Sequence, residues 1–337
     1  LAIDAATFVV ATSFGKSIST GPGRPERAIA KLGMETGGAS SASSASPAPL
    51  ASGKPDRESG CVACPPACDC HFHVFTARES SPGARYQPAY TASFGDWRAL
   101  SGKAGIGRGI VVQPSFLGAD NRLLLQTLQQ APEALRGVAV VSGEVNQSDL
   151  RQLYEAGVRG IRLNLMGMND DAEYLRALPS AWWGNLMASG MHLELHADVG
   201  RIATLLPWVP SGVTVVLDHF AKPAAANADD PTLRAAQRRA GNGDAVYITL
   251  SGVYRLGGSD ERSGSMPGND HARALARLWL DVLGSKRLLW GSDWPCTNHE
   301  AHADYDRLRS QLDWLIADDA TRAAILADNP AALYWRA

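Results

Sequence analysis

Apolar residues along this chain cluster in eight short continuous runs between positions 68 and 293. The runs cover residues 68–75, 109–113, 137–141, 158–164, 192–197, 213–219, 245–251 and 288–293. They show little alternation of apolar and polar residues, which is typical of strands that are covered on both faces. We therefore expect eight buried strands.

Amphipathic stretches separate these runs, and each begins with a capping-type residue or a polar cluster. The clearest stretches are residues 121–130, 148–156, 171–189 and 270–283. Eight alternations of strand and helix predict the α/β class and a (β/α)8 TIM barrel, which we expect over residues 65–337. Residues 302–337 are expected to add two or three C-terminal helices, the last beginning at Pro330.

Residues 1–64 differ from the rest of the chain because they are rich in Ala, Ser and Gly, with a low-complexity tract at 39–50. Such a composition cannot bury a core, so it predicts a disordered N-terminal leader. The opening run is mildly apolar, but Asp4 interrupts it and no basic region precedes it, which argues against a secretory signal. Since the chain begins with Leu1, a disordered leader or an over-extended gene start is the favoured interpretation, and a cytoplasmic location is expected.

Composition narrows the function classes. The chain has 337 residues, of which 45% are hydrophobic, so it can bury a full core. Its net charge of -2 gives no electrostatic reason to expect nucleic acid or an anionic membrane as a partner. No apolar run approaches the length of a bilayer span, which predicts a soluble protein. A small-molecule substrate is therefore the expected partner, and the number of subunits stays open.

Four of the five cysteines lie close together at Cys61, Cys64, Cys68 and Cys70. The first two have the spacing of a zinc or iron–sulfur knuckle. However, Cys68 and Cys70 fall within the first apolar run, where alternation predicts that they face packed helices. We favour ordinary thiols over a structural metal, and the distant Cys296 implies no disulfide framework.

The segment CDCHFHVF places His71 and His73 two residues apart in the first strand. Since side chains alternate along a strand, both imidazoles and Asp69 are expected to point to the same side. Imidazole can bind a metal, carry a proton or polarise a carbonyl. A pair of satisfied polar core residues is the alternative interpretation.

Polar residues follow nearly every other expected strand, at the end where a barrel carries its active site. Taken singly, such residues can be helix caps or solvated side chains. Their repetition at one end of a barrel favours a joint functional site. They are Gln113, Ser115, Arg162, Asn164, Glu194, His196, Asp218, His219, Ser251, Arg255 and Asp293.

Several of these segments resemble the amidohydrolase-related family. The matching motifs are CDCHFHVF, GIRLN, VVLDHFAKP, ITLSGVYR and LLWGSDWP. QPSFLGADNR followed by GVAVV is most similar to the branch that holds pyrone dicarboxylate lactonase and galactarolactone isomerase. The resemblance covers residues 67–335 and implies a TIM-barrel hydrolase that opens a small lactone.

The resemblance leaves the cofactor open. Metal-dependent members of the superfamily hold zinc at positions that correspond to His71, His73, His196 or Glu194, His219 and Asp293. The lactonase branch is understood to work without metal, with histidines on the lactone carbonyl and the last strand's aspartate activating water. The preferred interpretation therefore requires no cofactor, with zinc possible at His71, His73, His196 and Asp293.

For lactone hydrolysis, we expect Asp293 to be the base and His71, His73 and His219 to stabilise the developing oxyanion. Arg162 and Arg255 are expected to clamp a substrate carboxylate. Lys222 stands where the pyrone lactonase has arginine. Further substrate contacts are expected at the mouth of the site, from Ser115, Asn121 and Arg85 with its neighbour Tyr86.

One departure from the family bears on the substrate. The pyrone lactonase carries an extra basic residue after the GIR motif, whereas this chain reads LMGMND at 165–170. With one cation fewer, a sugar-acid lactone or another small monoanionic lactone is favoured over the pyrone dicarboxylate. The alternatives are a zinc-dependent hydrolase or decarboxylase, a lactone isomerase and a non-catalytic binding protein.

Overall fold

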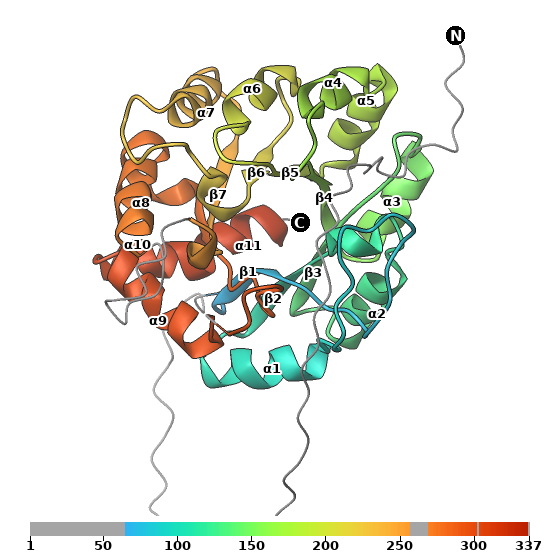
Figure 1. Cartoon of the computed structure of the whole chain (residues 1–337), viewed down its shortest axis with the longest axis horizontal. Helices are drawn as coiled ribbons and strands as arrows, with labels where there is room; N and C mark the ends of the chain where they lie inside the picture. Colours follow the sequence, from blue (N-terminus) through green and yellow to red (C-terminus); the bar gives the residue numbers. More distant parts are fainter. Residues whose placement is uncertain (1–64, 257–268, 302, 336–337) are drawn as a thin grey trace, which may run out of the picture. The chain divides into compact units, whose positions relative to one another are not determined.

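The computed structural model describes residues 65–256, 269–301 and 303–335. In this part of the chain, eight parallel strands lie side by side in chain order, with helices around them (Figure 1). The strands are β1 Cys68–Phe72, β2 Arg108–Val112, β3 Leu135–Ala139, β4 Val158–Asn164, β5 His192–His196, β6 Val215–Leu217, β7 Val246–Leu250 and β8 Leu288–Trp290. The predicted TIM barrel is confirmed, and each strand lies within or close to its apolar run.

The helices follow the strands in the predicted alternation. They are α1 Phe94–Lys103, α2 Arg122–Gln130, α3 Gln147–Glu155, α4 Asp171–Ala177, α5 Ser180–Ser189, α6 Ile202–Leu205, α7 Pro231–Gly241, α8 Asn269–Leu283, α9 Tyr305–Leu315, α10 Asp319–Ala323 and α11 Asn329–Tyr334. The last three are the expected C-terminal helices, and Pro330 lies in the first turn of α11.

The amphipathic stretch at 171–189 forms two helices, α4 and α5, which are divided at Leu178 and Pro179. Leu178 is extended, with ψ of 129°, because the ring of a following proline disfavours helical backbone. Pro179 then precedes the first turn of α5, where its missing N–H costs nothing.

The barrel closes between β1 and the residues that follow β8. The Asp293 amide donates to the His71 carbonyl at 2.8 Å, and the His73 amide donates to the Trp294 carbonyl at 2.8 Å. A Cβ on Gly291 would lie 2.5 Å from the His71 Cβ, so only glycine allows this approach. The closure therefore joins His71, His73 and Asp293 through the backbone.

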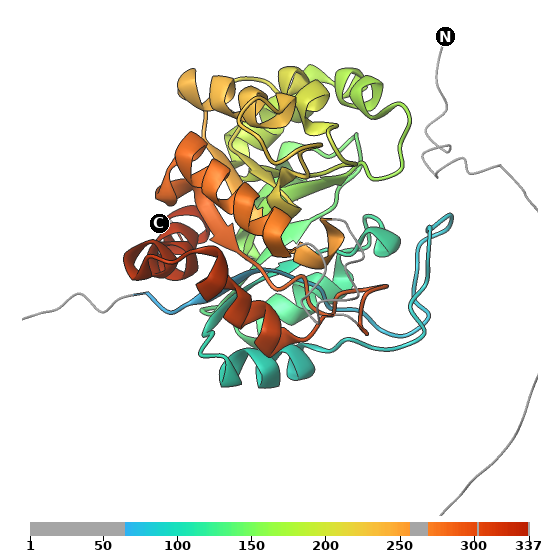
Figure 2. The ribbon, with the colours of Figure 1, turned by 60° about the vertical axis from the view of Figure 1, so that its left-hand side comes forward.

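Apolar side chains form two layers. The outer layer lies between the strands and the helices, and includes Phe72, Leu193 and Trp279. The inner layer fills the barrel, and Tyr334 of α11 packs into it. Figure 2 shows α11 at one end of the barrel and the segment between β1 and α1 projecting at the other. The C-terminal helix thus covers the end of the barrel opposite to that segment.

A β-bulge in β1 overturns two predictions about side-chain direction. Asp69 pairs with Gly109 and Phe72 with Val111, so three steps along β1 match two along β2. Cys68 and Cys70 consequently lie in the inner layer, not against the helices. Asp69 points outward to Trp97 of α1 and Tyr305 of α9, away from His71 and His73.

The expected leader and its cysteines, Cys61 and Cys64, lie outside the described residues. Within the described part, Cys68, Cys70 and Cys296 are free thiols in buried positions. None of the helices that the structure describes is both long enough and apolar enough to cross a bilayer.

Candidate active site

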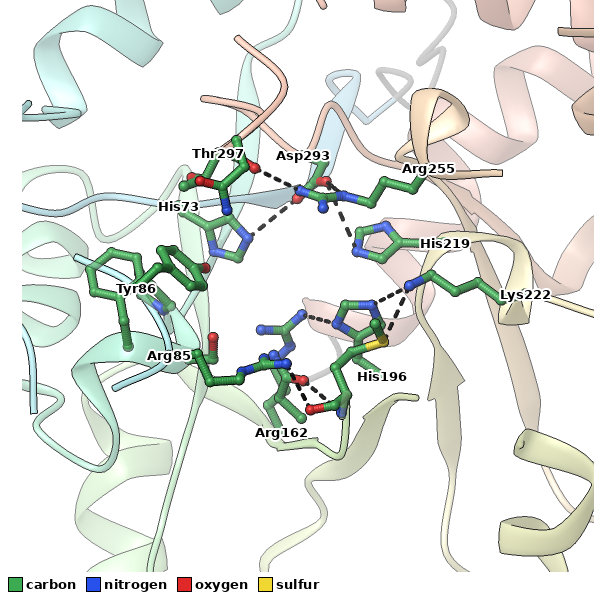
Figure 3. A pocket seen from close by; sticks show the side chains of 16 residues that line it. His73, Arg85, Tyr86, Arg162, His196, His219, Lys222, Arg255, Asp293 and Thr297 are labelled. Atoms are coloured by element: carbon green, nitrogen blue, oxygen red, sulfur yellow. Dashed lines mark hydrogen bonds and ion pairs between the residues drawn. The ribbon is translucent and has the colours of Figure 1, made fainter. Parts of the chain in front are cut away.

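A cavity of about 230 Å³ opens at the carboxyl ends of the strands, and side chains from many of the strand ends point into it (Figure 3). Most of the predicted site residues line it: His73, Arg85, Ser115, Arg162, His196, His219, Lys222, Arg255 and Asp293. His71 lies fully buried beside this group. Asn121 does not reach the cavity, because its side-chain amide binds the backbone N–H and C=O of Val140.

Asp293 is almost completely buried and its two oxygens have different neighbours. Oδ1 lies 3.3 Å from His73 Nε2. Oδ2 accepts hydrogen bonds from the Tyr254 hydroxyl at 2.6 Å and from Arg255 Nε at 2.7 Å. Burial alone would raise the pKa of Asp293, but the positive charge of Arg255, above all, holds it well below its usual range. The carboxylate is therefore ionised at neutral pH.

Tyr254 binds Asp293 directly, and the sequence analysis did not identify it as a site residue. It stands beside Arg255 in the GVYR motif, and η4, a 3-10 turn at Val253–Arg255, directs both side chains to the same carboxylate oxygen. Arg255 was expected to clamp a substrate carboxylate. The structure instead pairs it with Asp293, and this pairing raises the pKa of the guanidinium despite burial.

Neighbouring oxygen atoms decide the protonation of the two strand-one histidines. His73 Nδ1 lies 2.8 Å from the Val112 carbonyl, which can only accept, so Nδ1 carries the proton. Nε2 of neutral His73 then presents a lone pair to Asp293. His71 Nδ1 lies 3.3 Å from Asp218 Oδ1 and its Nε2 lies 3.8 Å from Asp293 Oδ1. Asp218, above all, outweighs burial and raises the pKa of His71, so its surroundings favour the protonated imidazole.

A layer of buried charge lies beneath the cavity. Arg162 donates through Nη2 to Asp218 Oδ2 at 2.8 Å, and its Nε lies 3.2 Å from Glu194 Oε1. Burial, together with the negative charge of Asp218, raises the pKa of Glu194 to about 8. His71 and Arg162 outweigh burial at Asp218 and hold its pKa well below the usual range. Glu194 is thus neutral and Asp218 ionised, so Arg162 has a full internal counter-charge.

The turn after β6 presents His219 and Lys222 to the cavity in an unusual backbone conformation. Four consecutive residues without a glycine have positive φ, of 51°, 58°, 60° and 42° for His219, Phe220, Ala221 and Lys222. Such residues rarely adopt the left-handed region unless their surroundings hold them there. Here Trp279 of α8 donates through Nε1 to the Phe220 carbonyl at 3.0 Å, and the Gly200 amide donates to the Lys222 carbonyl at 2.8 Å.

Two cations that line the cavity, Lys222 and Arg85, have no carboxylate partner among the described residues. Lys222 Nζ lies 2.9 Å from His196 Nε2 and 3.3 Å from the Met166 sulfur. Arg85 Nη1 donates to the Met166 carbonyl at 2.7 Å. Burial and the charge of Arg255 lower the pKa of Lys222 to about 8. Met166, which the sequence analysis also did not identify, is therefore the meeting point of both cations.

The donor set is chemically suited to a divalent cation. His71, His73 and Asp293 offer three ligand atoms that all lie within 4.8 Å of one another, and a second such group is His71, Asp218 and His219. His71 Nε2 is buried and has no hydrogen-bond partner, and the Val112 carbonyl orients His73 as the backbone commonly orients metal-bound imidazoles. His196 belongs to neither group, because its two ring nitrogens face Lys222 and Arg162.

Comparisons with known proteins show what the chain is similar to. The family model for amidohydrolases matches residues 68–336. The 2-pyrone-4,6-dicarboxylate hydrolase of Comamonas testosteroni is 29% identical over 277 residues, which cover 80% of this chain and 90% of that protein. The 4-sulfomuconolactone hydrolase of Rhizobium radiobacter is 28% identical over 281 residues, which cover 80% and 89%.

Solved structures share the fold. A protein from Acinetobacter baumannii, assigned as a 2-pyrone-4,6-dicarboxylic acid hydrolase and solved with citric acid bound, is 30% identical to this chain. The two superpose with a TM-score of 0.70 over 80% of this chain and 99% of the other. The match therefore takes in the whole barrel.

Because Glu194 is neutral and Asp218 is ionised, replacing each by its amide should change the stability of the protein by different amounts. Glu194→Gln replaces a neutral group, so stability at pH 7 should equal or exceed that of the wild type. Asp218→Asn leaves Arg162 without its counter-charge and should cost about 3–5 kcal/mol. Unfolding in urea measures both, and equal losses in the two variants would contradict the assignment.

The pH dependence of stability in the wild type and in Glu194→Gln provides a control. The pKa of Glu194 in the fold, about 8, lies above its ordinary value of 4.5. Hence unfolding releases a proton between these values, and the wild type should lose stability relative to Glu194→Gln as pH rises from 4.5 through about 8.

Proposed function

The chain belongs to the amidohydrolase family, and we propose that it hydrolyses a small lactone that carries one acidic substituent. The observation that carries this proposal is the division of charge across the cavity. On one side lies an ionised, buried Asp293. On the other lie two cations, Lys222 and Arg85, that no carboxylate neutralises among the described residues. An anionic substrate held by the cations has its reactive carbonyl facing the base.

In the proposed reaction, Asp293 removes a proton from the attacking water as the water adds to the lactone carbonyl. The C–O bond to the ring oxygen then breaks, and Asp293 returns the proton to the departing ring oxygen. Tyr254 and Arg255 hold the other carboxylate oxygen, so the base keeps one orientation. His219 is the proposed donor to the oxyanion. Its Nδ1 lies 2.9 Å from the Ser251 hydroxyl, and when Ser251 donates there, the proton of His219 is on Nε2, toward the cavity.

The acidic substituent is assigned to the wall at Met166. Arg162 and Arg255 have internal carboxylate partners, which removes them as the main charge partners of a substrate. Lys222 and Arg85 converge on one residue, as expected for a single carboxylate with two oxygens. This supports a monoanionic lactone over a dicarboxylate. The names of the curated relatives, both lactone hydrolases, support the reaction class.

A metal-dependent hydrolase is the second candidate, and the lone pair of His73 Nε2 favours it. This bare nitrogen lies 3.3 Å from Asp293 Oδ1, and the two atoms need a proton or a cation between them. His71, His73 and Asp293 would hold such a metal, which would polarise the carbonyl and lower the pKa of water. An isomerase on the same residues would leave the number of ester bonds unchanged.

Asp293→Asn should lower kcat/KM for the lactone by about 10²–10⁴-fold, since loss of a positioned base removes that much. The substrate panel is galactarolactone, 2-pyrone-4,6-dicarboxylate and L-fucono-1,5-lactone. Acid release in a pH-stat measures opening, and one ¹⁸O incorporated from labelled water separates hydrolysis from isomerisation. Asp313→Asn, an exposed change on α9, is the matched control. Wild-type turnover by Asp293→Asn would contradict the proposal.

Metal content separates the two candidates. Protein purified without chelators should contain far less than one metal per chain and should keep its activity with EDTA. Stoichiometric zinc that is lost together with activity on chelation, and lost in His73→Ala, would replace the metal-free mechanism with the second candidate.

Lys222→Met should raise KM for galactarolactone by about 10–100-fold, as expected for one charge-assisted hydrogen bond, with kcat little changed. Because Lys222 has a pKa of about 8, it is cationic below that pH and loses its charge above it. In the wild type, KM should therefore rise as pH increases through about 8, whereas Lys222→Met should lack this rise. Neutral L-fucono-1,5-lactone is the control substrate. Equal KM changes for both lactones would contradict the assigned role.

A further inference from the structure

Asp69 is a buried carboxylate on the outer side of β1 that the proposed reaction does not use. It is completely shielded from solvent. Its oxygens accept from Trp97 Nε1 at 3.0 Å, the Ser292 amide at 2.8 Å, the Ser292 hydroxyl at 2.6 Å, the Tyr305 hydroxyl at 3.1 Å and the His71 amide at 3.2 Å. Within the described ranges no cation pairs with it. Five hydrogen bonds therefore hold this buried carboxylate in one position.

Two of these donors belong to Ser292, the residue before the proposed base. The Ser292 amide donates to Oδ1 of Asp69 and the Ser292 hydroxyl donates to Oδ2, so one carboxylate binds both the backbone and the side chain of Ser292. The same hydroxyl accepts from the Trp294 amide at 3.0 Å. Ser292 therefore fixes the chain on both sides of Asp293.

Asp293 needs this support because its own backbone is left-handed. Its φ is 57°, in a region that residues with a Cβ seldom adopt. The Asp293 amide donates to the His71 carbonyl at 2.8 Å, and the Asp293 carbonyl accepts from the Cys296 amide at 2.7 Å. The bonds through Ser292 add to these by holding the residue before Asp293 and the amide after it. With them in place, Oδ1 faces His73 and Oδ2 faces Tyr254 and Arg255.

We infer that Asp69, acting through Ser292, is a positioning residue that holds Asp293 in its left-handed conformation and so aims its carboxylate into the cavity. Asp69 itself contacts neither substrate nor cavity. The inference rests on the proposed role of Asp293 as the base. It assigns to the motif that carries His71 and His73 a second task, performed on the opposite face of the strand.

The test compares Ser292→Ala with Tyr305→Phe. Both remove one hydroxyl donor from Asp69 Oδ2, but only the first frees the chain around Asp293. Ser292→Ala should lower kcat for the best lactone of the panel by about 10–100-fold, since small displacements of a catalytic group cost that much. KM should change by less than about threefold, because the Lys222 wall is untouched. Tyr305→Phe should lower the melting temperature and leave kcat unchanged.

A crystal structure of Ser292→Ala gives a readout that does not depend on turnover. The φ of Asp293 should leave the left-handed region, or its Oδ1 should move away from His73 Nε2. Ser292→Cys, with a weaker donor of similar size, should have an intermediate kcat, and it serves if the alanine variant does not fold.

Three results would overturn the inference: Ser292→Ala with wild-type kcat, equal losses of kcat in Ser292→Ala and Tyr305→Phe, or an unmoved Asp293 in the variant structure. Failure of the proposed function looks different. In that case the wild type and Asp293→Asn would open no lactone, while the crystal structure of Ser292→Ala would still decide whether Asp69 positions Asp293.

Discussion

The site depends on the contact between β1 and the residues that follow β8. A parallel barrel must bring its first and last strands together, and here the last strand ends early, at Trp290. Closure is completed by the Asp293 amide on the His71 carbonyl and the His73 amide on the Trp294 carbonyl. Because these backbone bonds link the proposed base directly to the two histidines, their relative positions are set by the barrel and not by flexible loops. Gly291 makes the contact possible by leaving the space beside His71 empty.

Buried charge decides which groups are available to a ligand. Arg162 is matched by Asp218, and Arg255 by Asp293, so these cations are already neutralised by the fold. Glu194 stays neutral because burial and Asp218 both disfavour its ionised form. Lys222 and Arg85, which meet at Met166, have no such partner among the described residues. The sequence motifs predicted Arg162 and Arg255 as the clamp for a substrate carboxylate. Only the three-dimensional pairing shows that both already bind a carboxylate of the protein.

The parts of the structure that depend on local pattern were predictable from the sequence. Eight continuous apolar runs gave eight strands, and polar residues at their ends gave most of the cavity. The errors arise where tertiary contacts override alternation. The β1 bulge, which no local pattern announces, turns Asp69 outward and the two cysteines inward. Asn121 is absent from the cavity because a backbone amide and carbonyl at Val140 satisfy its side chain. Tyr254 was missed because its role needs Asp293, 39 residues later in the chain.

Both sides of the cavity carry their functional groups on left-handed backbone without glycine. On one side this is Asp293, and on the other it is the turn from His219 to Lys222. Each is held by a polar group outside the cavity: Ser292 with Asp69 on the first side, and Trp279 bound to the Phe220 carbonyl on the second. Such conformations are unfavourable by about 1–3 kcal/mol per residue, so they persist only where the surroundings enforce them. The two supports use different helices: α1 and α9 hold the base, and α8 holds the turn that carries both His219 and Lys222. In the proposed function Lys222 and Arg85 bind the anion, so a change of substrate that leaves the base in place requires changes at Met166, Lys222 and Arg85, without disturbing the closure that holds Asp293.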